Sequence, residues 1–290
     1  MTPEYKQYLS RLSLDGIQRQ IDFVKQVDLK TADIDDLKLQ LNNLLWAYSA
    51  FAVLINGERS IYRARRHLPE ERDKALDRVE EIYPQTKFIE TLGRANREQQ
   101  AVFYFSIDPV IALHECKAAP GDVFTILECK PRGGTEPCLV PIRIHDLFKK
   151  HNKRMGGDFP APAERMRQLF ENDESNLRKY QLIDAFVERE FLRIVDRGNE
   201  HEFKLTIAVA EYLFAFETDL GRVDGIAYPS IASDWYNANV AFLPEPFRRL
   251  YKPVGCIWQK IDGVKEGLGF DVGEIVAKRV TEDGKIEWPQ

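Results

Sequence analysis

The chain has 290 residues, of which 44% are hydrophobic and 30% are charged. This balance is typical of a globular protein with a sizeable core and excludes disordered and collagen-like chains. The formal net charge of −5 argues against a nucleic-acid partner, because binding to phosphate backbones needs a basic surface.

The chain shows no signal for a membrane or for export. Its longest largely apolar run, Leu44 to Ile55, covers twelve positions, fewer than the ~20 that a membrane-spanning helix needs. Its first residues lack the basic and apolar stretches of a secretory leader, so we expect a cytoplasmic location. The four cysteines form no C-x-x-C pair and have no histidine at a metal-ligand interval, so we expect reduced, mostly buried thiols and no metal: Cys116, Cys129, Cys138 and Cys256.

Two helices are expected at the start of the chain. Leu14, Ile17, Ile21 and Val24 mark a short one. Apolar residues recur at three- and four-residue steps from Leu37 to Ile55, which predicts a longer helix packed on the body of the protein, capped by Thr31 or Asp33 and stopped at Asn56-Gly57. We therefore divide the chain into a helical N-terminal extension, residues 1–57, and a second domain, residues 58–290.

The second domain mixes strand and helix signals, which predicts an α+β fold with a mixed β core and flanking helices. In chain order we expect a strand from Ser60, a charged helix Glu70–Glu81, a strand Ala101–Ser106, a helix from Asp108-Pro109 to Cys116 and a strand Val123–Cys129. We then expect a loop with a small helix over Pro131–Pro162, helices Asn176–Val195 and Phe203–Phe216, an extended segment Gly225–Ser230, and short strands between Cys256 and Trp288 with turns at Asp262-Gly263 and Asp283-Gly284.

Common catalytic motifs are absent from the sequence. There is no G-x-x-x-x-G-K-[ST], H-E-x-x-H or G-x-S-x-G pattern. Residues 267–273 resemble a dinucleotide loop, but no helix follows, and we interpret them as a turn. His114 is interpreted as structural, and Glu188 and Glu190 point in different directions on one predicted helix, which argues against a paired-glutamate site.

A set of spaced motifs remains: Gly93-Arg94-Ala95-Asn96, Val102-Phe-Tyr104-Phe, Ala112-Leu-His-Glu115, Asp224-Gly-Ile-Ala-Tyr-Pro-Ser230 and Asn239-Val-Ala. Together they resemble the RES domain family, named for its arginine, glutamate and serine, with the family's order and intervals from about Ile61 to Phe242. Each motif alone is weak. An arginine after glycine is usually a solvated charge, a tyrosine such as Tyr104 is usually a core residue, a glutamate such as Glu115 is ordinarily a surface residue, and a serine after proline such as Ser230 can simply start a turn.

The resemblance implies a fold related to ADP-ribosyltransferase toxins and an activity that destroys NAD, as a toxin opposed by a cognate antitoxin protein. By position, Glu115, Arg94 and Tyr104 match the family's catalytic residues. The residues matched for binding NAD are Arg63, Arg94, Tyr104, Ser230 and Asn239. NAD is then a substrate, and no metal is implied. The N-terminal extension and the Pro131–Pro162 segment depart from the family pattern and leave partner and regulation open.

The residue types suit this chemistry. Nicotinamide leaves NAD as a neutral molecule, so its departure needs no general acid. It does need stabilisation of the positive ribosyl centre, which a carboxylate such as Glu115 supplies directly or through a ribose hydroxyl. Arginines pair with the pyrophosphate, Tyr104 offers a face for nicotinamide, and Ser230 offers a short polar contact.

Three alternatives stay open. Water or phosphate is the acceptor if the chain cleaves NAD, and a macromolecule is the acceptor if it is an ADP-ribosyltransferase. In a third interpretation the RES scaffold is a non-catalytic interaction protein whose helical extension is the working surface. The extension is compatible with occluding the cleft, bridging a homodimer or binding a partner.

Overall fold

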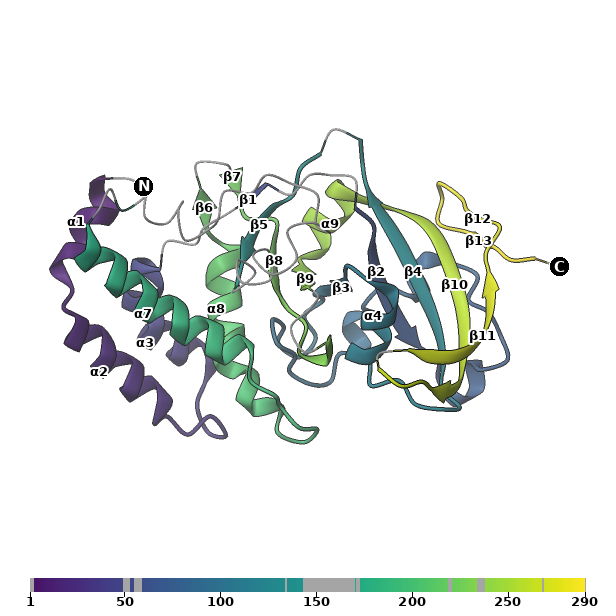
Figure 1. Cartoon of the computed structure of the whole chain (residues 1–290), viewed down its shortest axis with the longest axis horizontal. Coiled ribbons are helices and arrows are strands. Elements are labelled where there is room, and N and C mark those ends of the chain that lie inside the picture. Colours follow the sequence, from purple (N-terminus) through teal and green to yellow (C-terminus); the bar gives the residue numbers. More distant parts are fainter. Residues whose placement is uncertain are drawn as a thin grey trace.

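The computed structural model describes residues 3–48, 53–54, 59–133, 135–142, 170, 173–218, 221–233, 238–267 and 269–289. A nine-stranded sheet in the order β1-β5-β8-β9-β3-β2-β4-β10-β11 forms the centre, and helices flank it (Figure 1). β5 and β8 are parallel, whereas the other neighbours in this sheet are antiparallel. The predicted α+β class, with a mixed sheet, flanking helices and N-terminal helices, is confirmed.

The strands of the large sheet are β1 (Val53–Leu54), β2 (Ile61–Arg66), β3 (Phe103–Ser106), β4 (Val123–Pro131), β5 (Cys138–Pro141), β8 (Gly225–Pro229), β9 (Ala238–Phe242), β10 (Tyr251–Val264) and β11 (Phe270–Val276). Two small hairpins are made by β6 (Glu217–Thr218) with β7 (Gly221–Arg222), and by β12 (Arg279–Val280) with β13 (Ile286–Glu287).

The α-helices are α1 (Pro3–Arg11), α2 (Leu14–Lys25), α3 (Ile34–Ala47), α4 (Pro109–Glu115), α7 (Glu174–Phe191), α8 (Lys204–Phe214) and α9 (Pro244–Leu250). Short 3-10 turns are η1 (Pro69–Glu71), η2 (Val79–Glu81), η3 (Thr86–Phe88), η4 (Glu200–Phe203) and η5 (Ile231–Ser233). Within the described ranges, no helix has the length and apolar character needed to cross a membrane.

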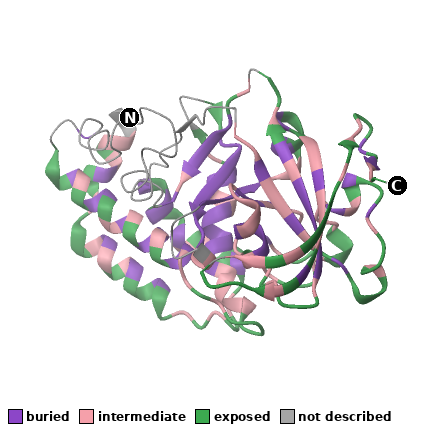
Figure 2. Cartoon of the chain, turned by 45° about the vertical axis from the view of Figure 1, so that its right-hand side comes forward, coloured by how far each residue is buried: buried purple, intermediate pink, exposed green. Residues whose placement is uncertain are grey.

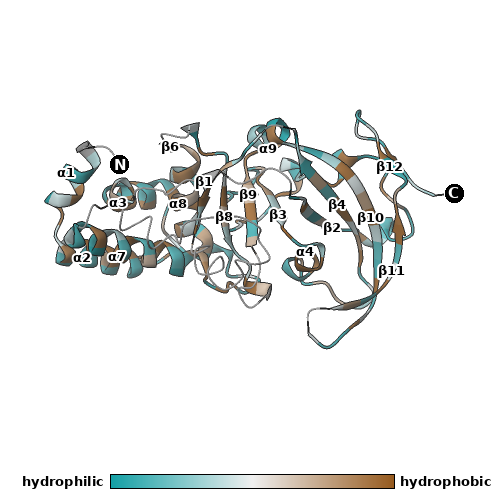
Figure 3. Cartoon of the chain, turned by 45° about the horizontal axis from the view of Figure 1, so that its top comes forward, coloured by the Kyte–Doolittle hydropathy of each residue, from teal (hydrophilic) through white to brown (hydrophobic). Residues whose placement is uncertain are grey.

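The N-terminal helices form a layer with α7 and α8 at one end of the sheet (Figure 1). Asp33 caps α3 by accepting hydrogen bonds from the N–H groups of Asp35 and Asp36, which identifies it, and not Thr31, as the helix start. The buried side chains of α2 and α3 share one apolar cluster with those of α7 and α8. In Figure 3 the ribbons of α2 and α7 alternate between hydrophilic and hydrophobic residues, as expected of amphipathic helices.

A charged network ties this helical layer to the segment that carries Arg94. The guanidinium of Arg97 donates from Nε to Glu211 on α8 at 2.5 Å and from Nη2 to Asp35 on α3 at 2.5 Å. Lys38 Nζ reaches the same Glu211 carboxylate at 2.7 Å. Three separate segments of the chain therefore meet at one partly buried carboxylate.

The long N-terminal helix is shorter than predicted. α3 ends at Ala47, and Val53–Leu54 form β1, antiparallel to Leu139 and Cys138 of β5. The expected continuation to Ile55 is wrong, because the backbone at 53–54 pairs with the edge of the sheet, and an almost uniformly apolar run cannot distinguish a helix from a buried strand. The expected stop at Asn56-Gly57 lies outside the described residues.

The predicted helix Glu70–Glu81 is also wrong. The segment contains only the turns η1 and η2. Its backbone bonds go elsewhere: the N–H of Val79 donates to the carbonyl of Gly284, and the N–H of Ile286 donates to the carbonyl of Asp77. The C-terminal hairpin thus satisfies backbone groups that a helix would have used internally.

Two further segments differ from expectation. The predicted loop Pro131–Pro162 contains β5, and residues 143–169 lie outside the described part of the chain. Asp262-Gly263 is not a turn but lies within β10 at a β-bulge, which absorbs the extra residue. The turn at Asp283-Gly284 is confirmed, with Gly284 at φ +83°. The predicted turn over residues 267–273 is right only at its start: Gly267 (φ +82°) lies between β10 and β11, whereas residues 270–273 belong to β11 and pair with β10.

The two faces of the sheet are packed differently. One face is filled by an aromatic cluster that includes Phe103, Phe105, Phe242 and Phe247. On the other face α4 covers β2 and β4 through a small cluster, while α7 and α8 pack near β8. Figure 2 shows the resulting buried centre along the strands. The four cysteines form no disulfide with one another, and three of them, Cys129, Cys138 and Cys256, are buried, in agreement with the predicted mostly buried thiols.

A buried histidine predicts how stability depends on pH. His67 is 2% exposed; its Nδ1 lies 2.9 Å from the carbonyl oxygen of Glu71, which can only accept, and its Nε2 lies 2.7 Å from the Thr125 hydroxyl. Burial lowers the pKa of His67, so the folded state holds the neutral ring. As the pH falls below about 6.5, His67 is therefore protonated in the unfolded chain before it is protonated in the folded protein.

We therefore expect the free energy of unfolding to be fully developed above about pH 6.5 with respect to this group and to fall as the pH drops below that value. Denaturant titrations of wild type and His67→Gln between pH 7.5 and pH 5 measure this. The wild-type curve should show the steeper loss, and parallel curves would contradict the assignment.

Candidate active site

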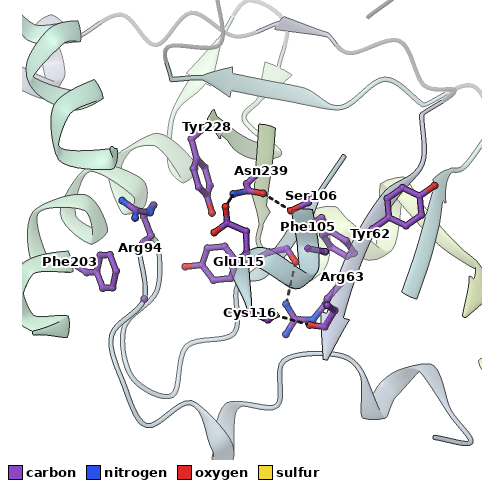
Figure 4. A pocket seen from close by; sticks show the side chains of 14 residues that line it. Tyr62, Arg63, Arg94, Phe105, Ser106, Glu115, Cys116, Phe203, Tyr228 and Asn239 are labelled. Atoms are coloured by element: carbon purple, nitrogen blue, oxygen red, sulfur yellow. Dashed lines mark hydrogen bonds between the residues drawn. The ribbon is translucent and has the colours of Figure 1, made fainter. Parts of the chain in front are cut away.

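A pocket of about 360 Å³ opens on the sheet face beside α4 (Figure 4). It is lined by Tyr62, Arg63, Ala64, Gly93, Arg94, Tyr104, Phe105, Ser106, Ala112, Glu115, Cys116, Phe203, Tyr228 and Asn239. Five of the six site residues predicted from the RES resemblance are therefore in its wall: Arg63, Arg94, Tyr104, Glu115 and Asn239. The sixth, Ser230, is fully buried and hydrogen-bonds to Glu115.

One row of side chains across four strands contributes to the pocket wall. Tyr228 on β8 lies opposite Asn239 on β9, Asn239 lies opposite Ser106 on β3, and Ser106 lies opposite Tyr62 on β2. Residues directly opposite each other in neighbouring strands project to the same face. Strand register alone thus gathers four polar or aromatic residues that are far apart in the sequence.

Glu115 reaches the pocket because α4 starts immediately after β3. Asp108 caps the helix by accepting from the N–H groups of Val110 and Ile111, and Pro109 suits the first turn. The helix buries Ile111, Ala112 and Leu113, while Glu115 is its last residue and stays exposed at the edge of that buried face.

The Glu115 carboxylate is held at one oxygen. Ser230 Oγ donates to Oε1 at 2.5 Å, and Asn239 Nδ2 donates to the same oxygen at 2.7 Å. Among the described residues no hydrogen bond involves Oε2. The arrangement fixes one carboxylate oxygen from the sheet side and leaves the other for a ligand.

Tyr104 is anchored by its hydroxyl. The hydroxyl accepts from the N–H of Ala95 at 2.8 Å and donates to Asn96 Oδ1 at 2.9 Å. A Cβ at Gly93 would lie 2.2 Å from that Asn96 oxygen, so the close turn needs glycine. Burial raises the pKa of Tyr104 far above its usual range, so the hydroxyl keeps its proton at neutral pH.

Arg94 is held by the end of α7. Its Nη1 donates to the carbonyl of Phe191, its Nη2 donates to the carbonyl of Arg193 at 3.1 Å, and its guanidinium carbon lies 5.2 Å from the centre of the Phe203 ring. A helix C-terminus is a favourable place for a cation. These bonds use two of the five N–H donors that an arginine carries.

Arg63 is fixed in a similar way from the other side of the pocket. Its Nε donates to the carbonyl of Ile82 at 3.0 Å and its Nη1 to the carbonyl of Tyr104 at 3.3 Å. Burial lowers the pKa of this guanidinium. The expected pairing of both arginines with a pyrophosphate therefore depends on their remaining N–H groups.

Several pocket residues were not predicted: Tyr228, Ser106 and Phe203 are the most informative. Tyr228 is 6% exposed, and its hydroxyl makes no hydrogen bond to the described residues. In Figure 4 this hydroxyl points toward Glu115. Tyr228 lies in the motif that ends at Ser230, so its place in that motif is the sequence signal that could have identified it as a site residue. No local pattern marks Ser106 or Phe203.

Two residues that were set aside from the candidate site, His114 and Glu190, make contacts outside it. The ring of His114 packs 4.6 Å from that of Phe270. Glu190 is 1% exposed and ion-paired with Arg189 and Arg193, so it is not part of a paired-glutamate site. Within the ranges that the structure describes, no three His, Cys, Asp or Glu side chains gather as candidate metal ligands.

Comparisons with protein-family models, curated protein sequences and solved structures found no match to this chain. The RES resemblance therefore rests on the motifs of the chain itself, and no family is assigned by comparison.

The two pocket tyrosines should differ in their effect on stability. Tyr104→Phe leaves the N–H of Ala95, a fully buried residue, without its partner, and we expect it to lower the free energy of unfolding by about 1–3 kcal/mol. Tyr228→Phe removes no hydrogen bond to the described residues and is the matched control, with an expected change within about 0.5 kcal/mol. Denaturant unfolding measures both, and equal losses would contradict the anchoring role of Tyr104.

Proposed function

We propose that this chain is a RES-type enzyme, with a fold related to ADP-ribosyltransferases, that cleaves NAD at the bond between nicotinamide and ribose. One observation carries the proposal. Residues matched to the family from five separate motifs meet around one pocket, and the carboxylate of Glu115 is fixed there by Ser230 and Asn239. Solvated surface charges and unrelated core residues would not be expected to gather around one pocket.

The proposed chemistry needs little from the protein except a placed negative charge. The bond from C1′ of the ribose to the nicotinamide nitrogen breaks, and its electron pair leaves with nicotinamide as a neutral molecule. The ribose carbon becomes positive, and the nearby carboxylate of Glu115 stabilises it. If water is the acceptor, its oxygen bonds to C1′ and one proton is released, which gives ADP-ribose.

The remaining pocket groups suit the rest of the substrate. Arg63 and Arg94 are held by main-chain carbonyls, so their remaining N–H groups are pre-oriented for phosphate oxygens. The half-buried ring of Tyr104 is available as a flat contact for nicotinamide. In this proposal the two arginines bind and Glu115 acts on the reacting atoms.

Substitution of Glu115 tests the proposal. Purified Glu115→Gln should release nicotinamide from NAD about 10²- to 10³-fold more slowly than wild type, because the stabilising charge is lost. Glu128→Gln is the control: its carboxylate lies on the same sheet face, accepts a hydrogen bond from Ser60 and is not among the pocket-lining residues. Chromatography of released nicotinamide measures the rates. Undiminished turnover by Glu115→Gln would refute the role.

The acceptor is tested with NAD labelled in its adenosine moiety. Hydrolysis predicts label in free ADP-ribose, phosphorolysis predicts label in a phosphorylated ADP-ribose when phosphate is present, and transfer predicts label on an added macromolecule. We expect free or phosphorylated ADP-ribose. Label that stays on protein or nucleic acid would favour an ADP-ribosyltransferase. Failure of the folded chain to bind NAD in calorimetry would favour a non-catalytic scaffold.

The toxin role has its own consequence. Expression of wild type in cells should lower total NAD, and expression of Glu115→Gln at the same level should not. An antitoxin partner would be sought only after depletion is observed, since its target would be this pocket or the surface around it.

A further inference from the structure

We propose that Ser106 is a positioning residue, which orients the Glu115 carboxylate by fixing the side-chain amide of Asn239. Ser106 is not one of the residues matched to the family. The inference rests on the proposed function only where its effect is measured as NAD cleavage.

The geometry is a short chain of hydrogen bonds. Ser106 Oγ lies 2.5 Å from Asn239 Oδ1, and Asn239 Nδ2 lies 2.7 Å from Glu115 Oε1. Ser106 and Asn239 are each 3% exposed. They are direct partners in the register of β3 and β9, so the sheet brings the two side chains together before any ligand binds.

Donor and acceptor roles give this chain a direction. A carboxylate oxygen can only accept, so Asn239 must present its NH₂ group to Glu115. Its Oδ1 then faces Ser106, whose hydroxyl donates to it. Without that hydroxyl the buried Oδ1 loses its hydrogen-bond donor. The side-chain amide of Asn239 is then held only by its bond to Glu115, so its orientation, and with it that bond, is less well defined.

A second donor is needed because one does not define the carboxylate plane. Ser230 donates to the same Oε1 from the segment after β8, and Asn239 donates from β9. Loss of the Asn239 bond leaves Glu115 attached at one point and free to rotate about that bond. Oε2 would then no longer face the reacting carbon at a defined angle, which lowers the rate of the chemical step.

The first test separates binding from chemistry. We expect Ser106→Ala to lower kcat for NAD cleavage about five- to tenfold, with KM changed less than about twofold. Ser106→Thr keeps the hydroxyl and suits a strand, so we expect it to recover most of the rate. A normal kcat in Ser106→Ala, or a change confined to KM, would overturn the proposal.

The second test asks whether Ser106 acts through Asn239. In an Asn239→Ala background the bond to Asn239 Oδ1 no longer exists, so Ser106→Ala should change kcat less than about twofold further. If Ser106 instead touched the substrate, the two losses would multiply. A multiplicative result would overturn the positioning role.

Thr125→Val is the matched structural control. It also removes a fully buried hydroxyl from a strand of the same sheet, but one that bonds to His67 outside the pocket. It should lower stability with kcat unchanged. A fall in kcat equal to that of Ser106→Ala would mean that both act through general destabilisation, which would also overturn the proposal.

A readout that is independent of activity keeps the two proposals apart. In ¹⁵N-labelled wild type, the side-chain amide protons of Asn239 should exchange slowly with solvent because Glu115 holds them, and Ser106→Ala should speed this exchange several-fold. If wild type does not cleave NAD, the proposed function fails and the exchange measurement alone decides the role of Ser106. Unchanged exchange would refute that role.

Discussion

The candidate site depends on the register between β8, β9 and β3. This register places Tyr228, Asn239 and Ser106 in one row, and the helix that follows β3 brings Glu115 above it. A slip of one residue in β9 would send Asn239 to the aromatic face of the sheet and take one of the two donors from the carboxylate. The packed aromatic cluster on that opposite face, which includes Phe105 and Phe242, resists such a slip. Core packing on one side therefore secures polar geometry on the other.

Main-chain carbonyl groups hold the two arginines of the pocket, Arg63 and Arg94, in place. Arg94 is fixed by carbonyls at the end of α7, and Arg63 by carbonyls of Ile82 and Tyr104. Carbonyls orient a guanidinium without cancelling its charge, whereas a carboxylate partner would neutralise it. The pocket can thus keep positive potential for an anionic ligand and still present rigid side chains.

Sequence patterns were sufficient where the determinants are local. Asp108, and Asp33 as one of two candidates with Thr31, were predicted as helix caps and are caps in the structure, because a cap acts within three residues. The segment 70–81 failed because its backbone partners are near Gly284, some two hundred positions away. The same reasoning applies to the site. The order of the motifs pointed to five residues that line the pocket. Ser106 reaches the pocket through strand register and Phe203 through the approach of α7 and α8, and neither is marked by a local pattern.

The Arg97 network bears on how the chain can be divided. Asp35 of α3 and Glu211 of α8 both bind Arg97, three residues beyond Arg94, and the apolar faces of α2 and α3 complete the core beneath α7. A fragment that begins at residue 58 would expose the apolar surface of α7 and α8. It would also lose the Asp35 partner of Arg97, which lies in the segment that carries Arg94. The helices α1 to α3 therefore help to support the candidate pocket, and a shortened version of the chain should keep them.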